Sequence, residues 1–380
     1  MLYWLIQSNL ERLEATPFGF LRVVTFAEFQ ALLATLTAFL AVWLSGERAI
    51  GWLRRQKIGD NPDFDNAAMN EAMKGKAGTP TMGGLLIVAA IAGVALLLAD
   101  LRNFYVLMGL VCLLWLGAVG AADDWLKLTA ARRSGGRQGL TSREKLAFQV
   151  GLAVILGVFA YRHGQAIDAA TRLYVPFFKA VAVDLPLWAF VAIAALVIVG
   201  TSNAVNLTDG LDGLAAGLMA LVAFAFLVLT LIISDARLAD FLLFHHIRQT
   251  DQMAVFCGAI VGACLGFLWF NCHPARVFMG DTGSLALGGL IGYVALVIRQ
   301  ELMLVLIGGV FVAEALSVML QVGYFKYTRR RYGEGRRILL MAPLHHHFQK
   351  KGWSETQVVV RFWLIGAMLA ALALATVKLR

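Results

Sequence analysis

The stretch Asn203-Ala204-Val205-Asn206-Leu207-Thr208-Asp209-Gly210-Leu211-Asp212-Gly213-Leu214 places two carboxylates and two amides between two strongly apolar segments. A carboxylate at the centre of a membrane helix costs about 2.5–3.5 kcal/mol, so carboxylates without a role would be poorly tolerated here. Asp209 and Asp212 are three residues apart and would share one face of a helical turn. Two interpretations are open. The stretch is either a polar turn between two helices, with Gly210 and Gly213 as helix breakers, or a cluster at the membrane surface that binds a polar ligand.

The composition excludes an ordinary soluble protein. The chain has 380 residues, of which 59% are hydrophobic and 15% charged, and its mean hydropathy is +0.73. These values are typical of a polytopic membrane protein. The net charge of +9 therefore predicts basic loops beside anionic lipid and no nucleic-acid partner. The isolated cysteines predict buried small residues, without a disulfide framework or zinc site; they are Cys112, Cys257, Cys264 and Cys272.

Apolar segments long enough to span a bilayer recur along the whole chain. We expect ten helices in a single all-α integral-membrane domain, residues 1–380, with no repeat. The predicted spans are residues 23–45, 82–99, 103–122, 146–161, 185–203, 213–234, 252–270, 284–298, 302–323 and 358–377.

Lysine and arginine are concentrated in the odd-to-even connections, as in the segment from Arg48 to Lys76 and the segment from Lys326 to Lys351. The positive-inside rule places these connections in the cytoplasm and both termini outside. Five polar motifs then share the cytoplasmic side and predict the walls of one site. They are Gly78–Gly84, Asp123–Lys127, Asn203–Leu214, Asn271 with Phe278–Ser284, and Pro343–Phe348.

Carboxylates at several helix ends, without Cys or paired-His metal spacing, favour a hard divalent cation such as Mg²⁺. Lys76, Lys127 and Lys145 offer positive charge for substrate phosphates. The residue types therefore predict phosphoryl-transfer chemistry, in which positioning and charge neutralisation dominate.

Each motif also has a purely structural interpretation. Asp123 and Asp124 are predicted to close the third span, where the helix dipole disfavours anions, and this placement favours a functional role. Asp281 could cap the eighth span. The three consecutive histidines at 345–347 point about 100° apart on a helix, so they would not chelate one zinc ion; hydrogen bonds to a phosphate or base, or a solvated loop, remain. Residues 326–337 are most simply a basic interfacial segment.

Taken together and in this order, the five motifs resemble those of the phospho-N-acetylmuramoyl-pentapeptide transferases, a branch of the polyprenyl-phosphate N-acetylhexosamine-1-phosphate transferases. The resemblance extends from about Thr25 to the last span. Thr79-Pro80-Thr81-Met82-Gly83-Gly84 and the triple histidine distinguish this branch from relatives that transfer GlcNAc-1-phosphate.

The resemblance implies a Mg²⁺-dependent enzyme of the bacterial cytoplasmic membrane, with its site facing the cytoplasm. Undecaprenyl phosphate would attack UDP-MurNAc-pentapeptide, giving lipid I and UMP in peptidoglycan synthesis, and a homodimer is expected. Asp281 would bind the metal, Asp123 would act as the base, Asp124 would support the same centre, and His345, His346 and His347 would form a lid. The implied substrate-binding residues are Lys76, Thr81, Lys127, Lys145, Asn206, Asp209, Gly210, Leu211, Asp212, Asn271 and Phe278.

The sequence departs from the family pattern at a few positions, such as Trp125 after the Asp pair and a longer loop before Lys145. Direct attack by the lipid phosphate and a covalent aspartyl-phosphate route are both compatible with the sequence. The alternatives are a polyprenyl-phosphate GlcNAc-1-phosphate transferase and a non-enzymatic lipid or solute transporter. Transporters place their sites near the bilayer midplane between repeats, which disfavours the latter.

Overall fold

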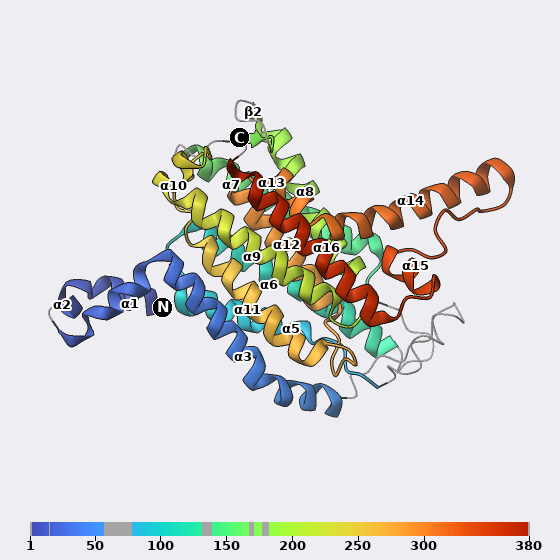
Figure 1. Cartoon of the computed structure of the whole chain (residues 1–380), viewed down its shortest axis with the longest axis horizontal. Coiled ribbons are helices and arrows are strands. Elements are labelled where there is room, and N and C mark those ends of the chain that lie inside the picture. Colours follow the sequence, from blue (N-terminus) through green and yellow to red (C-terminus); the bar gives the residue numbers. More distant parts are fainter. Residues whose placement is uncertain are drawn as a thin grey trace.

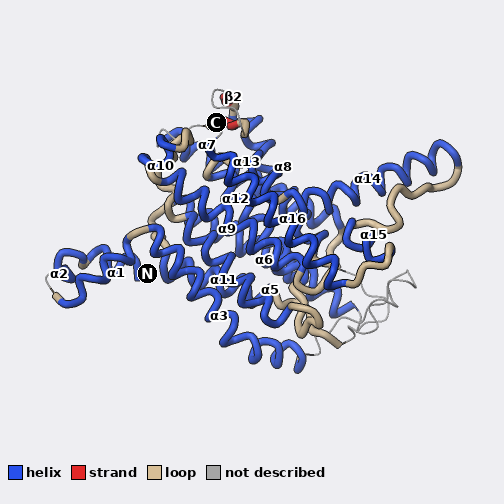
Figure 2. Tube along the Cα trace, in the orientation of Figure 1, coloured by secondary structure: helices blue, strands red, loops and turns tan. Residues whose placement is uncertain are grey.

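The computed structural model describes residues 2–14, 16–56, 78–130, 139–166, 171–176 and 182–378, and their backbone is almost entirely helical (Figures 1 and 2). A short antiparallel hairpin pairs Arg172 with Asp184. The elements are α1 (Leu2–Ser8), α2 (Leu10–Glu14), η1 (Pro17–Thr25), α3 (Ala27–Arg55), α5 (Gly84–Leu98), α6 (Phe104–Ala130), α7 (Ser142–Ala166), β1 (Arg172–Tyr174), β2 (Ala182–Asp184), α8 (Leu187–Thr208), α9 (Leu214–Ser234), α10 (Ala236–Phe241), α11 (Met253–Asn271), α12 (Gly280–Val297), α13 (Glu301–Ile307), α14 (Gly309–Tyr332), α15 (Leu344–Lys350), α16 (Glu355–Ala375) and η3 (Thr376–Lys378).

Nine helices in the described part of the chain are long and apolar enough to cross a membrane, and α5 is a shorter apolar helix. The prediction of an all-α polytopic membrane protein is therefore confirmed. One predicted span is wrong in detail, because residues 302–323 do not form one helix. α13 ends at Ile307, and α14 begins at Gly309 and continues to Tyr332. The glycine pair Gly308-Gly309 allows this break, since glycine is a poor helix former.

Helix α12 lies at the centre of the bundle, between α6 and α8. All its residues from Asp281 to Val297 are buried. The most extensive contact among the described helices joins α3 and α11. Glycines recur there every four residues, and a Cβ built on Gly262 would lie 2.0 Å from the carbonyl oxygen of Thr35. Small residues at this spacing let membrane helices approach backbone to backbone.

The two ends of the described chain lie away from the polar loops. Arg102, which follows α5, packs over the ring of Trp4 in α1 at 5.3 Å. In Figure 1 the C-terminus lies near β2, whereas α15 and the loops before α5 and after α11 lie at the other end of the bundle. Helix α14 projects from the bundle near α15.

The cysteine prediction is confirmed at three positions and wrong at one. Cys112, Cys257 and Cys264 are buried, but Cys272 is exposed, because α11 ends at Asn271 and the chain turns out into the loop there. All four are free.

Candidate active site

Asp123 and Asp124 lie within α6 and not at its end. The prediction that they close the span is wrong, because α6 continues through Lys127 to Ala130. The helix dipole therefore does not determine their environment. Both carboxylates are nonetheless buried, at 0% and 4% exposed, and their charge is balanced by hydrogen bonds and by lysines.

Asp124 caps the first turn of α12 from the neighbouring helix. Its Oδ1 accepts the N–H of Asp281 at 3.1 Å, and its Oδ2 accepts the N–H and hydroxyl of Thr282 at 3.0 and 2.7 Å. The alternative that Asp281 is itself the cap is wrong, since α12 begins at Gly280 and Asp281 lies in its first turn. Gly280 has a φ of +72°, and a Cβ there would lie 2.7 Å from the Asp124 carboxylate, so glycine suits both the turn and the contact.

Asp123 and Asp281 share two lysines. Lys127 Nζ lies 2.7 Å from Asp123 Oδ2 and 3.3 Å from Asp281 Oδ2. Lys145, at the start of α7, contacts the same two oxygens. The other oxygen of Asp123 accepts the N–H of Leu140 at 2.7 Å. The structure thus brings Lys145 into the centre despite the longer loop before it.

Asn206, in the last turn of α8, fixes Asp281 from a third helix. Its amide nitrogen donates to Asp281 Oδ1 at 2.8 Å and contacts Ser284 Oγ at 2.9 Å. Four helices therefore meet at Asp281: α6, α7, α8 and α12 itself.

The three carboxylates are chemically suited to a divalent cation. One oxygen from each of Asp123, Asp124 and Asp281 lies within 4.8 Å of the others. Mg²⁺ takes oxygen ligands and usually one or two protein carboxylates. The donor set therefore fits a hard cation, and the carboxylate of Asp281, the least buried of the three at 9% exposed, is the most accessible to one.

The Gly78–Gly84 loop lies directly against the loop before α12. The N–H of Phe278 donates to the carbonyl of Pro80, and the N–H of Gly83 donates back to the carbonyl of Phe278, both at 2.8 Å. Thr81 lies beside Gly280, because a Cβ on that glycine would meet its hydroxyl at 3.0 Å. These contacts place Thr81 and Phe278 at the edge of the carboxylate centre. Lys76 lies outside the described residues.

The stretch at 203–214 is divided by a helix end. α8 ends at Thr208, and the turn at 209–213 leads into α9, so the prediction that Asp209 and Asp212 share a helical face is wrong. The helix ends before both carboxylates, and Gly213, with a φ of +79°, precedes α9. The Asp209 carboxylate accepts the N–H of Gly280, and burial, with the nearby Asp281 and Asp124, raises its pKa to about 7. Asp209 thus borders the carboxylate centre.

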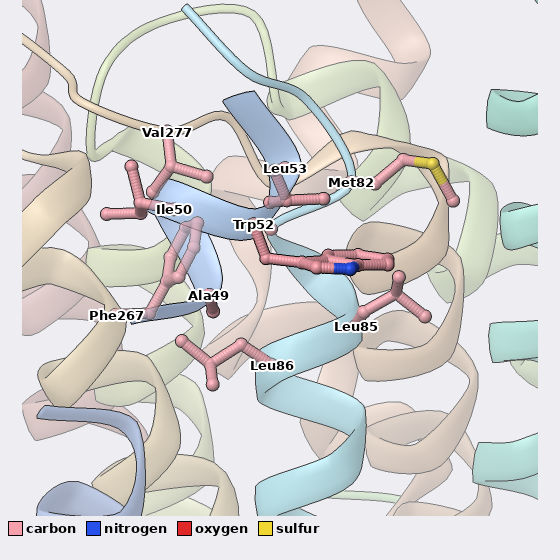
Figure 3. A pocket seen from close by; sticks show the side chains of 10 residues that line it. Ala49, Ile50, Trp52, Leu53, Met82, Leu85, Leu86, Phe267 and Val277 are labelled. Atoms are coloured by element: carbon pink, nitrogen blue, oxygen red, sulfur yellow. The ribbon is translucent and has the colours of Figure 1, made fainter. Parts of the chain in front are cut away.

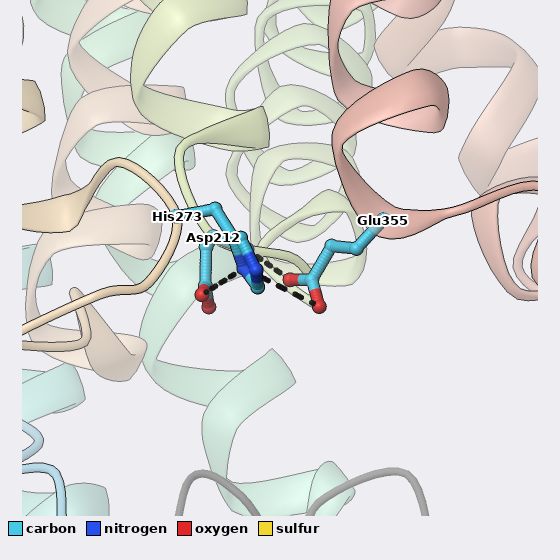
Figure 4. A group of neighbouring side chains, drawn as sticks. All are labelled: Asp212, His273 and Glu355. Carbon is cyan, nitrogen blue, oxygen red and sulfur yellow. Dashed lines mark hydrogen bonds and ion pairs between the residues drawn. The ribbon is translucent and has the colours of Figure 1, made fainter.

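Asp212 belongs to a second cluster (Figure 4). Its Oδ2 lies 3.0 Å from His273 Nδ1 and accepts the N–H of Ala275 at 3.0 Å. Its own N–H donates to Glu355 Oε1 at 2.9 Å, and His273 lies 3.9 Å from Glu355 Oε2. His273 and Glu355 were not among the residues predicted from the sequence. Their position could have indicated them, because each lies beside a helix end on the side of the bundle that carries the other motifs.

Asn271 joins the two loops that carry these clusters. Its side chain accepts the N–H of Gly213 at 3.1 Å and donates to the carbonyl of Val277 at 2.9 Å. It is 3% exposed. In the turn itself Leu211 is buried, whereas Gly210 is exposed.

The three histidines of α15 have three different environments, as the helix geometry predicts. His345 is buried at 1% exposed and lies against Glu314 of α14. His346 Nδ1 lies 2.8 Å from Gln349 Oε1, and His347 Nδ1 accepts the N–H of Leu340 at 3.1 Å. The pKa of His347 is lowered by partial desolvation and by Lys351.

An apolar cavity of about 180 Å³ adjoins this end of the bundle (Figure 3). Ile50, Trp52 and Leu53 of α3 line it together with Met82 and Val277. Met82 follows Thr81, so the cavity begins one residue from the edge of the carboxylate centre. Its lining suits hydrocarbon and offers no partner for a nucleotide.

Two family descriptions match parts of the chain that contain residues of this site. Residues 106–299 match the family model described as glycosyl transferase family 4. Residues 76–88 match signature 1 of the phospho-N-acetylmuramoyl-pentapeptide-transferases. The chain is 46% identical over 365 residues to the phospho-N-acetylmuramoyl-pentapeptide-transferase of Desulfotalea psychrophila (strain LSv54 / DSM 12343), covering 96% of this chain and 97% of that protein.

The similarity thus covers nearly the whole of both proteins. The chain therefore belongs to the phospho-N-acetylmuramoyl-pentapeptide-transferase family, within glycosyl transferase family 4.

Proposed function

We propose that the protein transfers phospho-MurNAc-pentapeptide from UDP-MurNAc-pentapeptide to undecaprenyl phosphate, forming lipid I and UMP. An oxygen of the lipid phosphate attacks the phosphorus attached to the sugar. The bond from that phosphorus to the bridging oxygen breaks, and UMP leaves with that oxygen. The observation that carries the proposal is the convergence of Asp123, Asp124 and Asp281 with two lysines at one end of a membrane bundle.

Bound Mg²⁺ would neutralise the charge that develops on the diphosphate. Asp281, held by Asn206 and by the cap at the start of α12, is its proposed ligand. Lys127 and Lys145 each reach two carboxylates, so their ammonium groups are placed to turn toward incoming phosphates. Asp123 is the proposed base, and it would accept the proton of a monoanionic lipid phosphate.

We propose that the turn at 209–213 binds the nucleotide end of the donor. Asp209 borders the carboxylate centre and Asp212 lies in the second cluster. The donor would therefore lie along the turn, with its phosphates near Asp209 and its uridine near Asp212. Thr81, Phe278 and Lys76 would line the same pocket, with α15 as a lid. The apolar cavity beside Met82 is suited to membrane lipid.

The decisive experiment compares radiolabelled donors with detergent-solubilised protein, undecaprenyl phosphate and Mg²⁺. We expect labelled lipid product from UDP-MurNAc-pentapeptide and none from UDP-GlcNAc, with activity abolished by EDTA. Product from UDP-GlcNAc alone would instead assign the GlcNAc-1-phosphate reaction. No product from either donor would overturn the proposal.

A further inference from the structure

Glu314 is a fully buried carboxylate in the membrane-spanning helix α14, at 0% exposed. An unpaired buried charge is strongly destabilising, so such a group is retained with a partner. Its contacts lead away from its own helix, to α15. None of the steps described above uses it.

One oxygen of Glu314 holds both the backbone and the ring of His345. Oε1 accepts the His345 N–H at 3.1 Å and lies 3.2 Å from its Nδ1. The hydrogen bond fixes the start of α15, since the N–H belongs to its first turn, and the imidazole lies beside the same carboxylate.

The other ring nitrogen lies over the proposed nucleotide turn. A Cβ built on Gly210 would be 2.5 Å from His345 Nε2, so the ring packs directly on that glycine. Gly210 stands between Asp209 and the second cluster. Among the described residues, neither ring nitrogen of His345 makes a hydrogen bond, and Glu314 Oε2 makes none either. Buried polar atoms without a partner are uncommon, and at such a place they point to a function.

We propose that Glu314 is a positioning residue for the transfer reaction: through His345 it holds α15 against the Gly210 turn and directs Nε2 to the nucleotide end of the donor. This inference rests on the proposed function. It predicts an effect on donor affinity and little effect on the chemical step, because Glu314 is argued to touch neither the carboxylate centre nor the reacting phosphates.

The test measures KM for UDP-MurNAc-pentapeptide and kcat separately. We expect Glu314→Ala to raise KM about tenfold, the usual cost of leaving a buried group unpaired, with kcat within about threefold. Glu314→Gln retains an oxygen acceptor of the same shape and should restore most of the affinity. Gln321→Ala is the matched control, because Gln321 of α14 holds Ile338 and Leu339 and not His345; it should leave KM unchanged.

A double-mutant cycle separates positioning from a general loss of structure. If Glu314 acts through His345, the variant with both Glu314→Ala and His345→Ala should have the KM of His345→Ala alone. Additive losses, or a fall in kcat at unchanged KM, would overturn the inference. Should Glu314→Ala fail to fold, Gly210→Ala tests the same contact: it must raise KM, and an unchanged KM would also overturn it.

These outcomes are distinct from failure of the proposed function. In that case the unsubstituted protein would make no lipid-linked product from UDP-MurNAc-pentapeptide.

Discussion

Asp124 of α6 accepts the backbone N–H of Asp281 in α12 at 3.1 Å, so one carboxylate of the centre orients the helix that carries another. The two side chains therefore have different roles. Asp124 satisfies three donors at the start of α12. Asp281 presents its oxygens to the lysines, to Asn206 and to the proposed metal.

Asp124→Asn should lower both stability and activity. An amide can point only one acceptor oxygen at three donors, so at least one buried donor loses its partner, which costs about 1–3 kcal/mol. We expect a lower Tm in detergent together with a large loss of turnover. A normal Tm would show that Asp124 does not hold α12.

Asp281→Asn should remove activity without this structural loss. Because it is the proposed metal ligand, we expect turnover to fall by about 100-fold or more and the response to added Mg²⁺ to weaken. The protein should remain folded and extractable, since the cap from Asp124 uses the backbone of residue 281. Near-normal turnover with an unchanged metal titration would exclude this role.

Asp212→Ala should mainly weaken binding of the UDP-linked donor. Loss of a contact made equally in the ground and transition states raises KM with little change in kcat. His273→Ala should shift KM in the same direction by less, because Ala275 still donates to Asp212. A collapse of kcat at unchanged KM would instead place Asp212 at the reacting phosphates.

Asp123→Asn tests the proposed base through pH. The second ionisation of a phosphate monoester lies near pH 6, so a base assists most below neutral pH. We expect steep loss of activity at acidic to neutral pH and partial recovery at alkaline pH, where the lipid phosphate is already a dianion. Asp124→Asn, the matched control, should show no such recovery. Equal loss at every pH, with both substrates still bound, would favour a metal-ordering or nucleophilic role.

The raised pKa of Asp209 predicts how the stability of the metal-free protein depends on pH. Its pKa is raised from 3.8 to about 7 in the folded protein, so the folded state keeps a proton that the unfolded chain releases above about pH 4. Stability should therefore fall as the pH rises from about 4 to 7. In EDTA, Asp209→Asn should reduce the fall in Tm between pH 5 and 8. Parallel Tm profiles for the two proteins would contradict the assignment.

The apolar segments predicted the membrane helices well because a helix that spans a bilayer needs about 20 mostly apolar residues. Helix ends were predicted less well where polar side chains pair within the bundle. Asp123 and Asp124 looked like a helix end, yet α6 continues past them to Ala130, and Lys127 and the first turn of α12 balance their charge. Such pairing depends on a helix more than 150 residues away in the sequence, which local patterns do not report.

The site was predicted where residue types were unusual for a membrane and missed where they were not. Asp281, Asn206 and Lys145 do meet, as their shared side predicted. His273, Glu355 and Glu314 are single polar residues beside or within apolar helices. Their importance comes from contacts with Asp212 and His345, and only the folded arrangement reveals these contacts.

The complete burial of α12 has a consequence for how the protein enters the membrane. Its mean hydropathy is 1.3, against 2.8 for the most apolar 18 residues of α9. Alone in the bilayer such a segment would expose its glycines to hydrocarbon. We therefore expect α12, the helix that carries the proposed metal ligand, to settle in the membrane only after the earlier helices α5, α6 and α8, which it contacts in the folded chain.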